Sequence, residues 1–400
     1  MRLGSRSVAG KCLLASAFLL AVLAFTNSQA QAQIFKAVYS FTGGADGGNP
    51  FNGLTIDSAG NFYGSAYDGG SYGAGAVFKV TPTGQEKAVY SFTGGTDGAN
   101  PLARLIMDSA GNFYGTTYGG GAYGTGTVFE LTKSGKEKVL YSFAGGSDGA
   151  NPEASLATDA AGNFYGTTYA GGAYGAGTVF ELTKGGTETV LHSFGSGTDG
   201  AYPVAEVTVG PNGQLFGTTS EGGAYGWGTV FQMMTKSGAV WKETVVHDFA
   251  FGSDGATPDA GLVLGRGGVL YGATYSGGDG AGGGGTIFEV APSGGSWTFT
   301  AIYGLSGWSN SGTLRDVLLD PAGNIYATTH CDGSDGLGTV YKLTRSSGGT
   351  WTYTELYDFT GGSDGYYSFS NLVVDKYGNL YGTVAYGGIG GAGVVFKVAP

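Results

Sequence analysis

The sequence is dominated by one motif that returns seven times. Tyr-Gly-Thr or a close variant begins at spacings of 51, 51, 51, 55, 55 and 55 residues, at Tyr63, Tyr114, Tyr165, Phe216, Tyr271, Tyr326 and Tyr381. A period of this length indicates a repeat architecture, in which each repeat is one supersecondary unit and neighbouring units bury a shared core. Any fold of this chain must therefore accommodate seven similar units.

Each repeat contains four short segments with the composition of β-strands. In the third repeat they are residues 156–159, 163–168, 178–182 and 190–194, here called strands A, B, C and D. Each segment is rich in β-branched or aromatic residues and is bounded by Gly, Asn or Asp. The A–B link, Asp-x-x-Gly-Asn, has residues that tolerate positive φ in a hairpin, and the C–D link is a second hairpin.

The ends of the chain predict that the repeats close into a ring. The segment 35–41 resembles a strand D with no A, B or C before it, and 394–398 resembles a strand C with no D after it. If the first segment completes the last unit, no sheet edge is left unpaired. The sequence therefore predicts an all-β fold, a seven-bladed β-propeller with four antiparallel strands per blade, as a single domain over residues 33–400.

The first 32 residues have the pattern of a signal peptide. Arg2, Arg6 and Lys11 form a basic start, residues 13–25 form an apolar run, and Ala30-Gln31-Ala32 is a small-x-small cleavage pattern. The run is too short to span a bilayer comfortably, and no second one follows. We therefore expect a secreted protein, extracellular or periplasmic, with no membrane partner. Because the chain stops at Pro400 directly after the last strand, we expect release rather than anchoring.

The charge and cysteine content of the chain limit the kinds of ligand and partner that we expect. Without the signal peptide, 16 basic residues remain against 30 acidic ones, and Cys331 is the only cysteine. A diffuse acidic surface disfavours nucleic acid but permits neutral ligands such as sugars, and also cations. One cysteine forms no internal disulfide, so stability must come from packing. We expect a monomer that needs no cofactor.

Three runs within the repeats are similar to a known family. They are Ser-Phe-x-Gly-Gly-x-Asp-Gly-x-Asn-Pro (91–101 and 142–152), Gly-Asn-Phe-Tyr-Gly-Thr-Thr (111–117 and 162–168) and Gly-Gly-x-x-Gly-x-Gly-Thr-Val-Phe (120–129). In these runs the chain resembles the Gloeobacter/Verrucomicrobia-type repeat family, over essentially all of residues 34–400. The resemblance implies a propeller-like fold in secreted bacterial proteins. It implies no established activity and no catalytic residues.

The most informative candidate positions are those that vary while the scaffold repeats. Strand A is normally innermost in a propeller, so residues just before it should rim the central channel. That position holds Gly53, Arg104, Ser155, Glu206, Gly261, Asp316 and Asn371. We take Arg104, Glu206, Arg315, Asp316 and Asn371 as candidate ligand contacts, with drift at solvated positions as the equally weighted alternative.

Two further sets repeat from blade to blade. The B–C loops carry Tyr72, Tyr123, Tyr174 and Tyr225, which would either stack on a ligand or pack on the neighbouring blade. The D–A links carry a set of acidic residues: Asp46, Asp97, Asp148, Asp199, Asp254 and Asp364, with Asn310 in the sixth repeat. Because this set recurs in nearly every unit, turn formation is favoured over cation binding, and no metal site is predicted.

No arrangement typical of a catalytic site is apparent. The sixth repeat departs from the others at His330, Cys331 and Asp332, but adjacent residues seldom converge on one ion and no second His lies near in sequence. His192 and His247 replace the tyrosine of strand D and are interpreted as outer-strand substitutions.

Three hypotheses for the function follow. The first is a non-catalytic secreted binding or scaffold propeller whose ligand is a carbohydrate or an extracellular protein segment. The second is a propeller hydrolase or lyase at the channel mouth, with Glu206 or Asp316 as base and Arg104 or Arg315 as oxyanion partner. The third is a structural surface component without a small ligand.

Overall fold

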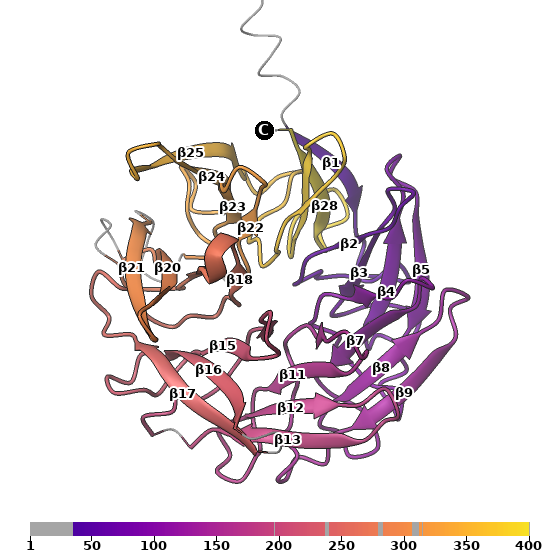
Figure 1. Ribbon diagram of the computed structural model, residues 1–400. Helices are drawn as coiled ribbons and strands as arrows, with labels where there is room; N and C mark the ends of the chain where they lie inside the picture. The colour runs from indigo at the N-terminus through magenta and orange to yellow at the C-terminus, as the bar shows by residue number, and fades with distance from the viewer. Residues whose placement is uncertain are drawn as a thin grey trace, which may run out of the picture.

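The chain forms a closed ring of seven sheets (Figure 1). The computed structural model describes residues 35–195, 197–236, 240–278, 283–305, 312–313 and 315–399. Each sheet is antiparallel and four-stranded, which confirms the predicted seven-bladed β-propeller. The expected signal peptide, residues 1–32, lies outside the described residues, and so does Asn310.

The two inner strands of each blade are short. Strand A has two residues and lies nearest the ring axis: β2 (Thr55–Ile56), β6 (Ile106–Met107), β10 (Ala157–Thr158), β14 (Thr208–Val209), β18 (Val263–Leu264), β22 (Leu318–Leu319) and β26 (Val373–Val374). Strand B follows: β3 (Phe62–Ala66), β7 (Phe113–Thr117), β11 (Phe164–Thr168), β15 (Leu215–Thr219), β19 (Leu270–Ala273), β23 (Ile325–Thr328) and β27 (Leu380–Val384).

Strand D is the longest strand of every blade or equals the longest, and strands C and D are both longest in blades 4 to 6. Strand C is β4 (Ala76–Val80), β8 (Thr127–Leu131), β12 (Thr178–Leu182), β16 (Thr229–Lys236), β20 (Thr286–Ser293), β24 (Thr339–Arg345) and β28 (Val394–Val398). Strand D is β5 (Glu86–Ser91), β9 (Glu137–Ser142), β13 (Glu188–Ser193), β17 (Val240–Asp248), β21 (Ser296–Gly304), β25 (Trp351–Asp358) and β1 (Phe35–Ser40). We number the blades by their strand A, so blade 1 is β2–β5 and blade 7 is β26–β28 with β1. One 3-10 turn, η2 (Arg266–Gly268), follows β18.

The glycine of the Tyr-Gly-Thr motif has a packing role. In blade 3, Gly166 of strand B faces Phe180 of strand C in register. A Cβ at Gly166 would lie 2.6 Å from the Phe180 ring, closer than van der Waals contact permits. The phenyl ring therefore covers the strand B backbone, and the same Gly–Phe pairing recurs in blades 1, 2, 4, 5 and 7. This packing explains why the motif is so regular.

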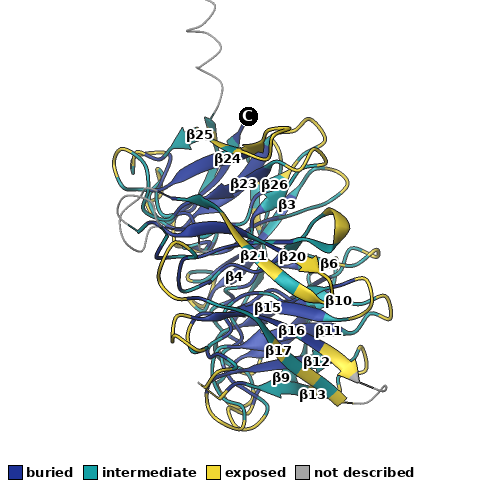
Figure 2. Ribbon diagram, turned by 60° about the vertical axis from the view of Figure 1, so that its left-hand side comes forward, coloured by how far each residue is buried: buried dark blue, intermediate teal, exposed yellow. Residues whose placement is uncertain are grey.

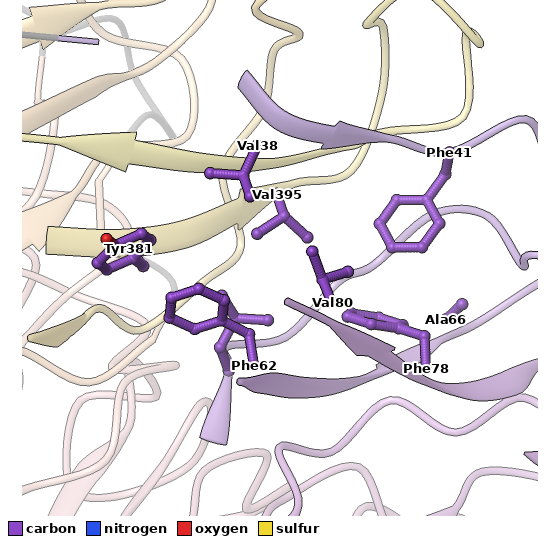
Figure 3. Close-up of a cluster of buried hydrophobic side chains, with 9 residues drawn as sticks. Val38, Phe41, Phe62, Ala66, Phe78, Val80, Tyr381 and Val395 are labelled. Atoms are coloured by element: carbon purple, nitrogen blue, oxygen red, sulfur yellow. The ribbon is translucent and has the colours of Figure 1, made fainter. Parts of the chain in front are cut away.

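The ring closes between the two ends of the chain. Strand β1 pairs antiparallel with β28, from Phe35 opposite Val398 to Ser40 opposite Val394. The pairing has a register shift between Ala37 and Tyr39, and the other six blades have a shift at the same place between strands C and D. Blade 7 differs from them only in that its two outer strands come from opposite ends of the chain. Figure 3 shows the core at this junction, where Val38 and Val395 of blade 7 lie near Phe62 and Val80 of blade 1.

The connections lie on two faces of the ring. Gly48 of a D–A link and Asp68 of a B–C link exchange backbone hydrogen bonds, so these two kinds of link share one face, as predicted. The A–B and C–D hairpins lie on the other. Burial is highest in strands B and C, whereas loops and parts of strand D are exposed (Figure 2). In the part of the chain that the structure describes, no helix is long and apolar enough to cross a membrane.

Candidate functional site

The varying residues before strand A converge at the centre of the ring. A cavity of about 10 Å³ lies there, lined by residues from six blades that include Asn52, Ser155, Glu206, Asp316 and Asn371. This volume holds about one water molecule. Short strands A bring the blades close to the axis, so side chains at one repeat position meet across the channel. The channel is consequently filled by side chains rather than open.

Two of the candidate residues form an ion pair across the channel. Arg104 of blade 2 donates from one terminal nitrogen to both carboxylate oxygens of Glu206 of blade 4, at 3.2 and 3.0 Å. The Glu206 carboxylate raises the pKa of the Arg104 guanidinium, against burial, which lowers it. Because the partners come from non-adjacent blades, this pair ties the ring together across its axis.

Asp316 and Asn371 form a second polar group beside this pair. Asp316 accepts a hydrogen bond from the Gly261 backbone N–H at 2.7 Å, and Asn371 Nδ2 donates to it at 3.4 Å. Burial, reinforced by the neighbouring Glu206 carboxylate, raises the pKa of Asp316 to about 7. Arg104 and Arg315 act in the opposite direction. The Asp316 carboxyl therefore takes up a proton near neutral pH.

Arg315 lies near a second set of acidic residues at the channel mouth, on the face of the D–A and B–C links, because its charge acts on their carboxyl groups. It lines the same cavity as Asp259 of blade 5. Burial raises the pKa of Asp259 to about 7, which the Arg315 charge opposes. Burial also raises the pKa of Glu153 of blade 3, again opposed by Arg315. Within the described residues, Arg315 forms no ion pair with either acid.

Several polar atoms in the channel and at its mouth are buried without a protein partner. They are Arg104 Nε, Arg315 Nε, Asp259 Oδ1, Asn371 Oδ1 and His330 Nδ1. Buried polar groups in folded proteins are normally hydrogen-bonded, and leaving one unpaired costs about 1–3 kcal/mol. A bound molecule that hydrogen-bonds to such a group would remove this cost. The set contains both donors and acceptors.

A chain of half-buried aromatic rings includes His330 and reaches Tyr275, on which the charge of Asp259 acts. We call Tyr275, His330, Phe369, Phe51 and Tyr67 the aromatic arc; they come from blades 5, 6, 7 and 1 in order around the ring. Neighbouring rings lie 4.5–6.3 Å apart between centroids. On the other side of the ring, Tyr169 and Tyr202 stack at 5.1 Å. The mouth is thus an aromatic rim around a polar centre.

His330 belongs to the aromatic arc rather than to a metal or nucleophile site. Its ring lies 4.5 Å from both Tyr367 and Phe369, and burial lowers its pKa to about 4. The imidazole is therefore neutral at physiological pH. Burial raises the pKa of the adjacent Cys331 thiol, which disfavours the nucleophilic thiolate. Among the described residues, no group of three His, Cys, Asp or Glu side chains is placed to hold a metal ion.

The four B–C loop tyrosines lie away from this site. Tyr72, Tyr123, Tyr174 and Tyr225 are between 63% and 72% exposed, so they do not pack on the neighbouring blade. Their loops are tied to the outer strand, because Ser71 N–H donates to the Ser91 hydroxyl. They form a separate outer row on blades 1 to 4, which the structure does not bring into contact with Arg104 or Asp316.

The acidic residues of the D–A links have structural partners. Asp46 accepts hydrogen bonds from the Tyr39 hydroxyl and the Thr42 backbone N–H, each at 2.9 Å. Asp97, Asp148 and Asp364 repeat this arrangement, and in blades 3 and 4 a histidine replaces the tyrosine, as in His192 with Asp199 at 3.1 Å. Turn formation therefore accounts for these carboxylates.

Sequence reasoning did not identify the aromatic arc, Asp259 or Glu153. Tyr67, Tyr275 and His330 occupy one repeat position, one or two residues after strand B. They resemble framework because tyrosine recurs there, also at Tyr118 and Tyr169. Phe51, Glu153, Asp259 and Phe369 share a position that varies as strongly as the channel position. That variation was the signal that could have found them.

The fold is similar to that of a larger extracellular domain. Two crystal structures from B. thetaiotaomicron, assigned to a one-component and to a hybrid two-component system, match with TM-scores of 0.59 at 9% and 10% identity. They cover 91% of this chain, whereas this chain spans only 40% and 39% of theirs. At such identity the likeness concerns the fold alone.

A third structure is less similar. An oxidoreductase from Thermus thermophilus, described as a glucose dehydrogenase, has 14% identity and a TM-score of 0.45, with 75% of this chain and 96% of that chain covered. This similarity is too low to support a conclusion. No curated protein matches the chain. The model of the Gloeobacter/Verrucomicrobia repeat matches residues 22–210 and 204–400. With nearly its whole length covered, the chain belongs to the Gloeobacter/Verrucomicrobia repeat family.

Proposed function

We propose that this protein is a secreted, non-catalytic propeller that binds a carbohydrate at its channel mouth. The observation that carries the proposal is the group of unpartnered buried atoms of Arg315, Asp259, Asn371 and His330 beside the aromatic arc. Binding sites for small molecules commonly combine an apolar, aromatic lining with a few convergent polar groups. The signal-like start of the chain supports a location outside the cytoplasm.

A neutral sugar suits the chemistry of the mouth. Arg315 Nε requires an acceptor, whereas Asp259 Oδ1 and Asn371 Oδ1 require donors when Asp259 is ionised. A hydroxyl group serves as either, so a polyhydroxylated ring satisfies the whole set. The aromatic rings offer flat apolar faces to the C–H side of such a ring. A highly charged ligand of either sign would be attracted by one of these two sets, the arginines or the acids, and repelled by the other.

The ion pair deeper in the channel favours binding over catalysis. Both Glu206 oxygens are engaged by Arg104, so this carboxylate is not free to act as a base. The cavity that Glu206 lines together with Asp259, Arg315 and Asn371 holds about one water molecule, so a sugar would lie above it and reach these residues from the mouth. The ion pair instead forms the floor of the site, and Arg315 and Asn371 are the contacts that face a ligand.

The proposal is tested with an array of neutral oligosaccharides, followed by calorimetric titration of each hit. Phe369→Ala and Arg315→Gln should weaken binding by about tenfold or more, since each removes a contact of about 1–2 kcal/mol. Lys184→Ala, an exposed residue of the opposite face, is the matched control and should leave affinity unchanged.

Three results would contradict the proposal. The first is no binding to any oligosaccharide by protein whose unfolding curve is normal. The second is equal affinity in wild type and both mouth variants. The third is hydrolysis or elimination of a bound oligosaccharide, detected by chromatography and lost in Glu206→Ala or Asp316→Ala, which would establish the enzyme hypothesis instead.

A further inference from the structure

A second cavity lies on the opposite face of the ring from the channel mouth. It occupies the groove between blade 7 and blade 1, on the side of the A–B and C–D hairpins, and has a volume of about 620 Å³. Ligand pockets typically measure about 300–1,000 Å³. We call it the closure pocket, because the strands that close the ring, β1 and β28, form one of its walls.

The corresponding groove between two other blades is much smaller. Between blades 2 and 3 the corresponding cavity measures about 180 Å³ and is lined by Lys184. There the Lys184 side chain lies beside Gly162, and Lys133 lies beside Gly111 in blade 2. Blade 1 has Pro82 at this C–D turn position, next to Gly60. The shorter proline side chain helps to leave the closure pocket open.

The closure pocket gathers positive charge in an otherwise acidic protein. Lys36, Lys376 and Lys397 line it, whereas the whole chain has a formal net charge of −11. Lys36 and Lys397 are directly opposite each other on β1 and β28. Like charges at directly opposite positions destabilise a sheet, so the fold itself does not favour this pair.

Most of the other repeats do not carry this charge. In blades 2 and 3 the position of Lys397 holds glutamate, Glu130 and Glu181, facing Lys138 and Thr189. Only blades 7 and 1 place lysine opposite lysine, with Lys79 facing Lys87 in blade 1. Lys376 replaces Ser58, Ser109, Ala160, Pro211 and Pro321 of five other repeats, and Arg266 is the one other basic residue there.

Two acidic side chains also line the pocket, so three lysines and two aspartates leave a formal charge of +1, but neither aspartate forms an ion pair with a lysine. Asp57 accepts hydrogen bonds from two backbone N–H groups, the Asn61 amide and the Tyr63 hydroxyl. Asp375 is held in the same way within the A–B hairpin of blade 7. Among the described residues, none of the three lysines forms an ion pair. The ammonium groups are therefore available to an external anion.

The closure pocket is also lined by an exposed aromatic ring. Tyr377 is 78% exposed and lines the pocket. Its position holds Ala59, Ala110, Ala161, Asn212, Gly267 and Ala322 in the other six repeats, so the hairpin does not require a ring. Lys376 Nζ lies 5.1 Å from the Tyr377 centroid, and Val374, which is 46% exposed, contributes apolar surface.

We propose that the closure pocket binds a carboxylate-bearing sugar ring, such as a uronic acid unit of an acidic oligosaccharide. Lys36, Lys376 and Lys397 attract the carboxylate, and Tyr377 stacks on the apolar face of the ring. The pocket size suits one or two sugar units. This site is separate from the channel mouth and does not depend on the carbohydrate proposed there.

The proposal is tested by calorimetric titration of the purified protein with trigalacturonic acid at low and at high salt. Binding should weaken as salt rises, because exposed ion pairs are screened. The double variant Lys36→Gln/Lys376→Gln should bind about tenfold or more weakly. Tyr377→Ala restores the residue of other repeats, so it should reduce affinity without reducing stability. Lys184→Gln, in the smaller groove between blades 2 and 3, is the matched control and should not change affinity.

Maltotriose and sodium sulfate separate the alternatives. Maltotriose should not compete with trigalacturonic acid for this pocket, and sulfate should compete only at far higher concentration. The proposal is overturned if trigalacturonic acid does not bind, if it binds the lysine and tyrosine variants as tightly as wild type, or if sulfate competes as strongly as the sugar. Loss of affinity in Phe369→Ala or Arg315→Gln would instead assign the acidic sugar to the channel mouth.

Discussion

The ring of Phe35, in the first described strand of the chain, stacks on Tyr357 of blade 6 with centroids 4.1 Å apart and an interplanar angle of 16°. Phe35 belongs to β1, which completes blade 7. The contact therefore holds the closing strand to the preceding blade as well as to its hydrogen-bonded neighbour β28. Ring closure thus depends on side-chain packing in addition to backbone pairing.

Two kinds of residue occupy the position of Phe35 around the ring, aromatic residues in some blades and glutamate in the others. In blades 5, 6 and 7 it is aromatic and stacks on the preceding strand D, as Phe299 on His247 at 3.8 Å and Tyr353 on Tyr303 at 5.3 Å. In blades 1 to 4 it is Glu86, Glu137, Glu188 and Glu243. One Oε1 atom of each glutamate is buried without a partner. The two halves of the ring should therefore differ in how they respond to mutation and to pH.

Phe35→Ala should destabilise the protein by about 2–3 kcal/mol, toward the lower end for deletion of a phenyl group because Phe35 is only half-buried. Urea unfolding followed by tryptophan fluorescence measures the change in free energy. Ile389→Ala is the control, since Ile389 is 88% exposed and its loss should change stability by less than about 0.5 kcal/mol. Equal midpoints for the two variants would show that the aromatic contact does not secure closure.

The outer glutamates should make stability fall as the pH rises through 7. Burial, with a smaller effect from Asp97 of the preceding blade, raises the pKa of Glu137 to about 7. The folded state thus binds more protons than the unfolded state between about pH 4.5 and 7, so this contribution is present at low pH and lost above pH 7. Glu137→Gln should be more stable than wild type at pH 8, by about 1 kcal/mol after allowance for solvent screening.

The comparison must be made at matched pH, because the histidines act in the opposite direction. Burial lowers the pKa of His192 and His247, so their contribution to stability is lost as the pH falls below about 6.5. Thermal unfolding of wild type and Glu137→Gln at pH 5.5 and pH 8 isolates the glutamate. A stability gain that is the same at both pH values would contradict a buried, protonated Glu137.

The fold was predictable because the signal for it is local and repeated seven times. Segments with strand composition, hairpin links and a D strand before Tyr63 determine the blade and its closure without long-range information. Comparing the seven repeats at the position just before strand A also predicted the polar residues of the channel, because this position varies and the topology brings it to the axis. These residues are Arg104, Glu206, Asp316 and Asn371. Their convergence followed from one assumption, that strand A is innermost.

The remaining features depend on contacts between distant segments. Lys36 opposite Lys397 is visible only once β1 and β28 are paired in register, and the register is not fixed by the sequence pattern alone. The arc from Tyr67 to His330 was overlooked because tyrosine recurs at that position and resembles framework. The exposure of Tyr72 and its equivalents depends on how each loop is tied to strand D, which composition does not specify.

Mutation of the exposed tyrosines tests whether they contribute to stability or contact a ligand. Tyr72, Tyr123, Tyr174 and Tyr225 contribute little packing, so Tyr→Ser at any one of them should change stability by less than about 0.5 kcal/mol. Tyr165, which is buried and donates to Asp159, should lose about 3 kcal/mol on mutation to Ala. If the four-tyrosine variant unfolds like wild type but loses affinity for a ligand, the outer row is a contact surface. A loss of stability close to that of Tyr165→Ala would show that the row is structural.

The ion pair across the channel should behave as a coupled unit. Arg104→Ala leaves Glu206 and Asp316 facing each other without the counter-charge between blades, and should cost about 3 kcal/mol. Burial and the Glu206 carboxylate together raise the pKa of Asp316, so Glu206→Ala should lower this pKa, as an NMR titration of the carboxyl carbon would show. The double variant should be more stable than the sum of the single losses implies, by about 1–3 kcal/mol. Additive losses in urea unfolding, with an unchanged Asp316 titration, would mean that the two side chains act independently despite their 3.0 Å separation.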